Sequence, residues 1–220
     1  PQTLWLALID AEVLRSISLT FGAAAVATIL AIFTGVPLAF LLARRKFRGK
    51  QLVEALVNLP IVIPHTAAGV ALLLVFGRRG LLGQWLTPLG VTFTDNFYGI
   101  VVGMLFVSLP FLVNLSRESL ALVDEEMELV ALIDGASPWQ AFWHVSLPQA
   151  WRGVLAGALM MWARGISEFG AVVILAYHPK IVPVLVFERF QGFGLVAAQP
   201  VAALLVLVSL RHSCSCDCLS

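Results

Sequence analysis

The chain has 220 residues, of which 60% are hydrophobic and 12% are charged, and its formal net charge is +1. An ordinary soluble domain has about 25% charged residues, so this composition excludes a water-soluble globule and a disordered chain. The near-neutral charge balance also excludes a basic footprint for nucleic acid, so no nucleic-acid partner is expected. The composition indicates an integral membrane protein, and the length allows about five or six crossings of roughly 20 residues each.

Five apolar intervals predict transmembrane helices, because a charged side chain at mid-bilayer costs roughly 2.5 to 3.5 kcal/mol. Four intervals contain no charged residue, and they span residues 16–43, 55–77, 96–116 and 190–210. The fifth interval, residues 154–176, contains Arg164 and Glu168. The sequence therefore predicts an all-α, polytopic membrane bundle with about five helices over residues 1–210.

Basic residues in the loops predict the orientation of the bundle. Five of them, which mark the cytoplasmic side, fall within seven residues: Arg44, Arg45, Lys46, Arg48 and Lys50. Alternation from this loop places residues 1–15, 78–95 and 177–189 outside the cell. The same alternation places residues 117–152 inside.

Both ends of the chain have unusual features. The chain starts with Pro1, and its first crossing runs from outside to inside, so we expect an earlier first helix to be missing. The last crossing looks shortened, and residues 211–220 form an atypical tail that contains Cys214, Cys216 and Cys218. Alternate-residue thiols are not a standard zinc arrangement, so an altered reading frame is favoured over a metal site, and we expect no metal.

The loop over residues 117–152 predicts two helices joined by a sharp turn. Asp124 suits a helix N-cap, and Gly135 suits the left-handed position that follows a helix. Ser137 and Pro138 suit the cap and first position of a second short helix, which is expected to end at Leu147-Pro148. Its tryptophans permit two interpretations: a helix lying at the membrane surface, or a helix that docks onto a partner protein.

The same loop resembles a known family signature. Gly135, followed by Val145-Ser-Leu147-Pro148, is similar to the loop of ABC-importer permeases, written as EAA, three residues, G, nine residues, I, one residue and LP. Leu129-Val130-Ala131 stands in place of Glu-Ala-Ala, and Glu128 lies one position earlier. The resemblance implies coupling to a separate ATPase, with the residues of the loop expected to act there being Gly135, Ala136, Ser137, Pro138, Trp139, Phe142, Leu147 and Pro148. Trp139 and Phe142 are predicted to be the anchors of that interface.

Three further segments narrow the resemblance to molybdate/tungstate permeases, and more distantly to sulfate permeases. They are Trp162–Ala171, Asn58–Gly69 and Glu188-Arg189-Phe190, and the similarity covers residues 12–210. It implies a type I importer fold in the cell (inner) membrane, with a second permease copy as a homodimer. It also implies two cytoplasmic ATPase subunits that use ATP and magnesium, and an external oxyanion-binding protein.

The chain itself is not expected to hydrolyse ATP or to hold a cofactor. A Walker A motif is absent, because Gly49-Lys50 is followed by Gln51. A channel or an ion-driven carrier remains an alternative. An intramembrane hydrolase that uses His65 is disfavoured, since no Gly-x-Ser-x-Gly motif is present.

Four polar residues inside the apolar intervals are candidates for a functional site. Arg164 and Glu168 lie one helical turn apart, and they form either an ion pair that locks helices together or a charged pair beside the translocation path. His65 and Ser167 are candidates for a gate or for packing. If Arg164 contacts a dianion in the path, the negative charge of Glu168 weakens the attraction, so the dianion does not stay bound to Arg164.

Overall fold

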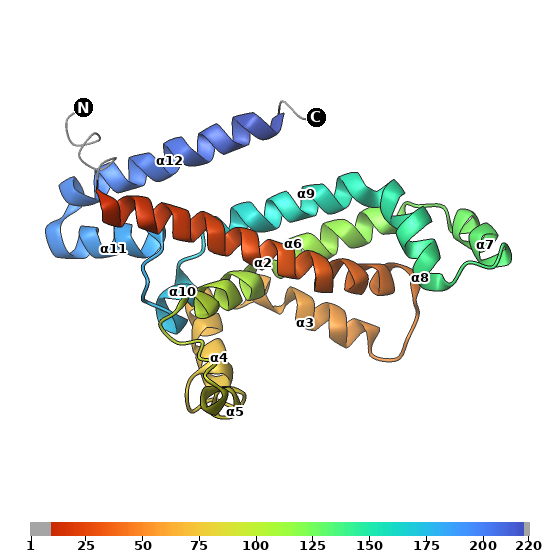
Figure 1. Cartoon of the computed structure of the whole chain (residues 1–220), viewed down its shortest axis with the longest axis horizontal. Coiled ribbons are helices and arrows are strands. Elements are labelled where there is room, and N and C mark those ends of the chain that lie inside the picture. Colours follow the sequence, from red (N-terminus) through yellow and green to blue (C-terminus); the bar gives the residue numbers. More distant parts are fainter. Residues whose placement is uncertain (1–9, 218–220) are drawn as a thin grey trace.

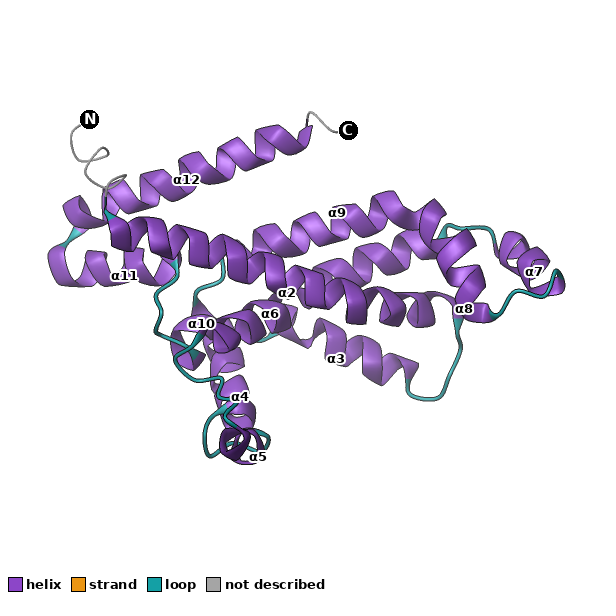
Figure 2. Cartoon of the chain, viewed as in Figure 1, coloured by secondary structure: helices purple, strands orange, loops and turns teal. Residues whose placement is uncertain are grey.

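The computed structural model describes residues 10–217, with side chains as far as Val208. This part of the chain consists of helices and connecting turns without a strand (Figure 2). In chain order the elements are α2 (Ala11–Arg44), α3 (Lys50–Val62), α4 (His65–Phe76), α5 (Gly83–Leu86), the 3-10 turn η1 (Thr87–Leu89), α6 (Phe97–Ala121), α7 (Glu125–Ile133), α8 (Pro138–Ala141), the π-helical turn η2 (Phe142–Ser146), α9 (Leu147–Ile166), α10 (Gly170–Leu175), α11 (Val182–Phe193) and α12 (Leu195–Asp217). The predicted all-α fold is confirmed.

Three long helices, α2, α6 and α9, lie side by side along the long axis of the molecule (Figure 1). Small residues line their contacts, so the backbones approach closely, as is common where lipid removes the hydrophobic drive between helices. A Cβ added at Gly157 of α9 would lie 3.2 Å from the carbonyl oxygen of Leu112 on α6. Ala23 and Ala27 of α2 are buried in the same way. These helices form the frame that holds the remaining elements.

Two of the five predicted crossings are single helices, α2 and α6. Among the described residues, these two helices are long and apolar enough to cross a membrane. The prediction of one helix per interval is wrong for the other three intervals, which divide at Pro64, at residues 167–169 and at Gly194. Pro64 lacks an N–H and forces Ile63 into an extended conformation, while Gly194 adopts a φ of 79°. The break at residues 167–169 allows Glu168 to leave the helix and reach its partners.

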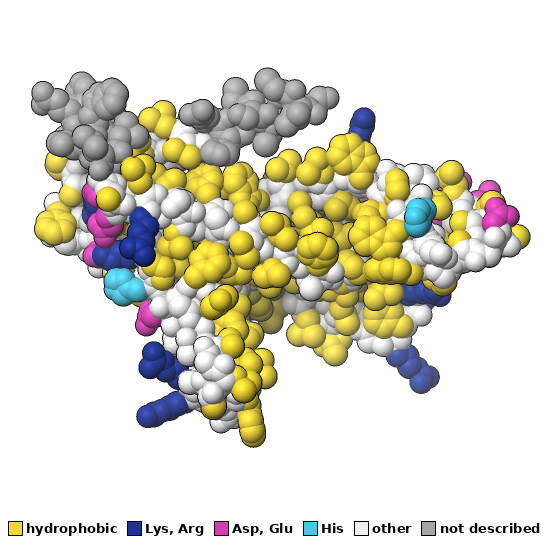
Figure 3. All heavy atoms as spheres, in the orientation of Figure 1, with side chains coloured by type: hydrophobic (Ala, Val, Ile, Leu, Met, Phe, Trp, Pro, Cys, Tyr) yellow, Lys and Arg dark blue, Asp and Glu magenta, His cyan; other side chains and the backbone are white. Residues whose placement is uncertain are grey.

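In the view of Figure 3, charged side chains lie at the two ends of the long axis and on the arm that contains α4 and α5, with a largely apolar surface between the two ends. At the end that we call the basic-loop end, Arg44 at the start of the basic loop contacts Val123 and Glu128. At the opposite end, which we call the N-terminal end, residues 10–15 contact residues 177–189 through ion pairs, and Asp95 accepts a hydrogen bond from the backbone of Tyr177. Parts of all three segments predicted to lie outside the cell therefore meet here, whereas most of residues 78–95 lies at the tip of α4 around α5 (Figure 1). The orientation itself stays a prediction.

The predicted tail, residues 211–220, lies outside the described side chains. The helical backbone of α12 is described as far as Asp217. The side chains of Cys214, Cys216 and Cys218 lie outside the described residues.

The short helices α4 and α10 pack against each other almost backbone to backbone. A Cβ added at Gly170 would lie 2.8 Å from the Cβ of His65, and one added at Gly69 would lie 2.9 Å from the carbonyl oxygen of Ala171. Contacts this short leave no room for a side chain, so α4 and α10 behave as one packed unit. This unit lies at the side of the three long helices, with α4 extending away from their long axis (Figure 1).

Substituting Gly170→Ala is expected to destabilise the protein, because the new methyl group must push α4 away from α10. Overpacking of this kind costs about 1 to 3 kcal/mol. Thermal unfolding of the full chain in detergent measures the effect as a fall in Tm. Gly22→Ala is the matched control, since a Cβ at Gly22 of α2 meets no atom within 4 Å, and an equal fall in both variants would contradict the close packing.

Candidate functional site

Four polar side chains meet where the helices α4, α9 and α10 are interrupted, and we call them the central cluster: His65, Arg164, Ser167 and Glu168. His65 is the first residue of α4, and Arg164 lies in the last turn of α9. Ser167 and Glu168 lie in the break that separates α9 from α10. The helix breaks therefore bring together residues that are 99 positions apart in the chain.

Arg164 joins the cluster through its guanidinium group. Its Nη2 atom lies 3.0 Å from the Oε2 atom of Glu168 and 2.7 Å from the Nε2 atom of His65. Its Nη1 atom donates to the Ser167 hydroxyl at 3.3 Å. Arginine is suited to this task because its planar group offers five donors in fixed directions.

The carboxylate of Glu168 is the buried centre of the cluster, with its side chain 1% exposed. Its Oε1 atom accepts a hydrogen bond from the backbone N–H of Ala171 at 2.9 Å, which caps the first turn of α10. A buried charge is strongly destabilising unless it is paired and hydrogen-bonded. Both of its oxygens have such partners, so the ionised form is accommodated.

The other three members of the cluster reach the surface of the chain. The side chain of Arg164 is 23% exposed and that of His65 is 43% exposed. Ser167 is also exposed, as is Thr66, which follows His65 in the chain. An exposed arginine and imidazole at this depth would be costly against lipid tails. This face is suited to contact with water or with a second protein surface.

The sequence predicted the pair of Arg164 and Glu168, but it placed both residues on one helix, one turn apart. The two residues do not lie on one continuous helix, since α9 ends at Ile166. The ion pair forms because the chain turns back after Ser167, with the Glu168 N–H bonded to the Gly165 carbonyl at 3.1 Å. The approach of His65 to this pair was missed, since no local pattern links residues so distant in sequence.

A second polar strip, also missed by the sequence reasoning, joins α3 to α6. Arg117 pairs with Glu54 at 2.9 Å, and Asn114 donates to the side-chain oxygen of Asn58 at 2.7 Å. The available signal was the presence of an asparagine in each of two apolar intervals. Along α3 this strip leads from the basic-loop end toward His65.

The loop at the basic-loop end has the predicted helix, turn and helix. The side chain of Asp124 accepts from the Glu126 N–H at the start of α7, and Gly135 adopts a φ of 93°. Ser137 and Gln140 form a reciprocal capping box at the start of α8, with Pro138 in its first turn. The turn is therefore fixed by backbone conformation and by capping, as the residue types predict.

The predicted end of the second helix at Leu147-Pro148 is wrong. Residues 138–166 form one continuous helical segment, in which η2 widens the backbone and Leu147 N–H bonds to the Phe142 carbonyl. A wider turn accommodates Pro148, which lacks an N–H and would clash with the carbonyl four residues earlier in a regular helix. The turn region is thus directly continuous with α9.

The two predicted interface anchors have different surroundings. Phe142 is 1% exposed and packs on Phe40 with ring centroids 4.7 Å apart, so it belongs to the core of this chain and cannot reach a partner. Trp139 is 55% exposed and lines an apolar groove of about 370 Å³. The groove runs along the lateral apolar face, with these further lining residues from α2 and α9: Ile32, Phe33, Pro37, Trp151 and Leu155. This position suits the first interpretation of the tryptophans, at the membrane surface.

The helix α7, at the tip of the loop, has exposed apolar side chains. None of its residues is buried, and Val130 and Ile133 are 58% and 83% exposed. The helix is held from beneath by Glu128, which pairs with Arg44 of α2 at 2.8 Å and accepts from the Ser146 hydroxyl at 2.8 Å. An exposed apolar surface presented on a fixed helix is of the kind that protein contacts use.

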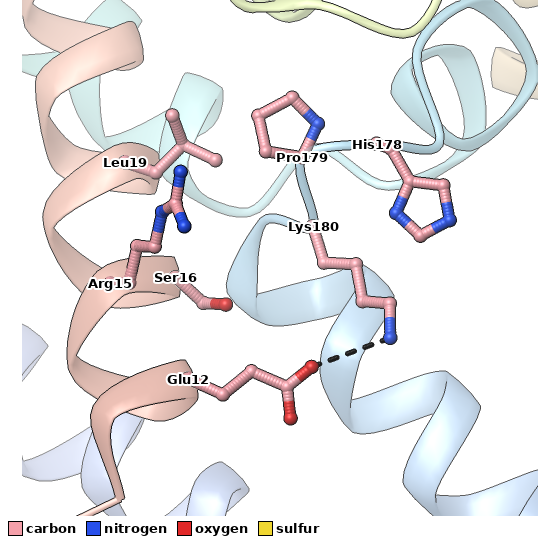
Figure 4. A pocket seen from close by; sticks show the side chains of 7 residues that line it. All are labelled: Glu12, Arg15, Ser16, Leu19, His178, Pro179 and Lys180. Carbon is pink, nitrogen blue, oxygen red and sulfur yellow. Dashed lines mark hydrogen bonds and ion pairs between the residues drawn. The ribbon is translucent and has the colours of Figure 1, made fainter.

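A shallow cavity of about 430 Å³ lies at the N-terminal end, between α2 and the segment before α11 (Figure 4). Its lining includes Glu12 and Lys180, whose side chains form the ion pair drawn there at 3.4 Å. Lys180 also pairs with Glu188 at 2.7 Å. The hydrogen bond from Lys180 lowers the pKa of Glu188, and the hydrogen bond from Arg189 lowers the pKa of Asp10.

These lowered pKa values predict acid destabilisation of the N-terminal end. A carboxyl with a depressed pKa in the fold stabilises the protein above its ordinary pKa, which is 4.5 for Glu and 3.8 for Asp, and this contribution is lost as the pH falls through the folded pKa. The Tm in detergent should therefore decrease as the pH falls below 4.5. Glu188→Gln should flatten this decrease, and an unchanged slope would contradict the assignment.

The helical fold, the apolar band and the polar cluster inside it define a membrane protein. The chain belongs to the family described as binding-protein-dependent transport system inner membrane component, which matches residues 35–211. It is 45% identical over 203 residues to the molybdate/tungstate transport system permease protein WtpB of Pyrococcus furiosus, covering 92% of this chain and 76% of the relative. It is also 34% identical to a probable sulfate transport system permease protein cysT of Zygnema circumcarinatum, covering 94% of this chain and 73% of the relative.

The fold is similar to that of a bacterial ABC transporter that imports alginate. The TM-score is 0.73 at 15% sequence identity, over 95% of this chain and 78% of the transporter chain. The family match and the similarity to named permeases identify the chain as a permease subunit of an ABC importer and not an enzyme. As a member of this family, it works with ATPase and substrate-binding components.

Proposed function

We propose that this chain is the multi-pass inner-membrane permease of an importer for molybdate or tungstate. The observation that carries the proposal is its similarity to four relatives named molybdate/tungstate permeases, at 41% to 45% identity. Relatives named sulfate permeases stand at 34% identity, so sulfate is the second candidate. All three substrates are tetrahedral dianions.

The translocation path is proposed to run along the exposed side of the central cluster, between this chain and a second copy. The partly exposed Arg164 and His65 support this placement, because lipid is a poor environment for both side chains. The polar strip on α3 and α6 continues the same line toward the basic-loop end. Two copies around one path form the homodimer that the resemblance implies.

The coupling surface for two cytoplasmic ATPase subunits, which bind ATP and magnesium, is proposed to be α7 together with the turn at Gly135. Ala136, Ser137 and Pro138 complete the turn, and its capping box gives it a fixed shape. Phe142 and Leu147 support the turn from the core of the chain, and Pro148 lies in the first turn of α9. Trp139 is proposed to hold the loop at the level of the lipid headgroups, beside its groove.

Uptake by the reconstituted complex tests the proposed substrate. The permease, its ATPase and its binding protein are placed in vesicles, and uptake of labelled tungstate is measured with ATP inside. Molybdate should compete at equimolar concentration, whereas sulfate should need a large excess. Stronger competition by sulfate than by molybdate would transfer the function to the second candidate, and uptake without ATP would contradict an ATP-driven importer.

Coupling is tested by Gly135→Val. At φ 93° a β-branched residue is strained, so the turn should change shape, and stimulation of the ATPase by the binding protein should fall by about ten-fold or more. Gly90→Val is the matched control, since Gly90 has a φ of 80° and a Cβ there also meets no atom within 4 Å, but it lies in the loop between α4 and α6.

A second variant keeps this test independent of backbone strain. Ile133→Asp changes a side chain that is 83% exposed, and Leu89→Asp changes one that is 75% exposed in the loop of Gly90. Only Ile133→Asp should reduce recovery of the ATPase with the permease. Equal recovery with both variants would place the coupling surface elsewhere.

A further inference from the structure

In the central cluster, another acceptor can replace His65 as a hydrogen-bond partner of Arg164. Arginine has no acceptor atom, so the 2.7 Å contact between its Nη2 and the Nε2 of His65 requires that Nε2 accepts the hydrogen bond. The ring is therefore neutral, with its hydrogen on Nδ1. That Nδ1 atom is buried without a hydrogen-bond partner, and it lies 3.8 Å from the Oε2 atom of Glu168.

His65 is thus held by one good hydrogen bond and leaves another group unsatisfied. An unpaired buried donor is destabilising, which lowers the net contribution of this arrangement to stability. The contact on the other side, between Nε2 and Arg164, is at the partly exposed edge of the cluster. An acceptor that arrives from the exposed side can replace the imidazole on Arg164.

We propose that the arriving acceptor is the transported oxyanion, and that Arg164 and the Ser167 hydroxyl form a transient subsite for it inside the permease. This inference rests on the proposed function. A tetrahedral dianion presents oxygens that match the forked donors of a guanidinium group, and it is a stronger acceptor than a neutral imidazole. The exposed Ser167 hydroxyl lies beside the same guanidinium and can donate to a second oxygen once it leaves the Arg164 carbonyl.

The negative charge of Glu168 weakens the binding of an anion at this subsite. The pair of Arg164 and Glu168 is neutral overall, and the carboxylate lies 3.0 Å from the guanidinium that the anion must contact. Repulsion between the carboxylate and the dianion prevents tight binding, so the anion leaves again. A subsite in a path has to be of this kind, because tight binding slows release.

The proposal makes opposite predictions for the acid and the base of the same ion pair. Arg164→Gln removes the donors and should abolish tungstate binding. Glu168→Gln removes the repulsion, so it should tighten tungstate binding by about ten-fold and slow turnover in uptake. His65→Ala removes the competing acceptor and should also raise the affinity. A cluster that only locks helices together would lower Tm in all three variants without creating any gain in affinity.

The experiment measures binding of labelled tungstate to the assembled permease and ATPase complex in lipid nanodiscs, without the binding protein. Arg79→Gln is the matched control, because Arg79 is an exposed arginine in the loop between α4 and α5, and it should leave binding unchanged. Arg164→Lys keeps the charge but loses the fork, so it should bind more weakly than the native chain and assemble normally.

Two outcomes separate this inference from the proposed function. If the native complex takes up tungstate but Glu168→Gln shows no gain in affinity and Arg164→Gln shows no loss, the subsite is disproved and the importer assignment stands. If the native complex takes up no tetrahedral oxyanion, the proposed function fails first. A gain in Glu168→Gln together with a loss in Arg164→Gln supports the subsite.

Discussion

The burial of one carboxylate, that of Glu168, is the constraint on which the middle of this structure depends. With 1% of its side chain exposed, the group must find compensation inside the chain, because an unpaired charge there is prohibitively costly. The chain supplies it by ending α9 at Ile166, by turning the Ala171 N–H of α10 toward the carboxylate and by bringing in Arg164. His65 then packs against Gly170, so the position of α4 follows from the same charge.

The two ends of the molecule are organised by charge in a different way. At the N-terminal end, the ion pairs of Lys180 and Arg189 tie the start of α2 to α11, in a partly exposed environment where each pair contributes little alone. At the basic-loop end, Arg44 is 7% exposed and donates to Glu128 and to the Val123 carbonyl. Of the five basic residues that indicate the cytoplasmic side, Arg44 is therefore a structural residue that orients α7.

Local patterns in the sequence predicted local structure well. The caps at Asp124 and Ser137 and the left-handed Gly135 follow from backbone and side-chain chemistry within a few residues, and all three were predictable. The helix break at residues 167–169 was not predictable, and neither was the contact of His65 with Arg164. Both depend on interactions that exist only after helices from distant segments have packed. Pro148 shows the opposite error: a local rule predicted a helix end, whereas a π-helical turn absorbed the proline.

That turn changes how the coupling loop relates to the central cluster. Residues 138–166 form one continuous helical segment, about 40 Å long at 1.5 Å per residue, with the Ser137 cap at one end and Arg164 in its last turn at the other. A displacement of the turn at Gly135 by a partner subunit would act on Arg164 through this single segment, without an intervening loop. Its far end leads into the turn at residues 167–169, where Glu168 bonds to Arg164 and to the Ala171 N–H of α10, so a shift of α9 acts on the contacts of Arg164 with Glu168 and His65. The three side chains that surround the buried charge thus also connect the end of this segment to α4 and α10.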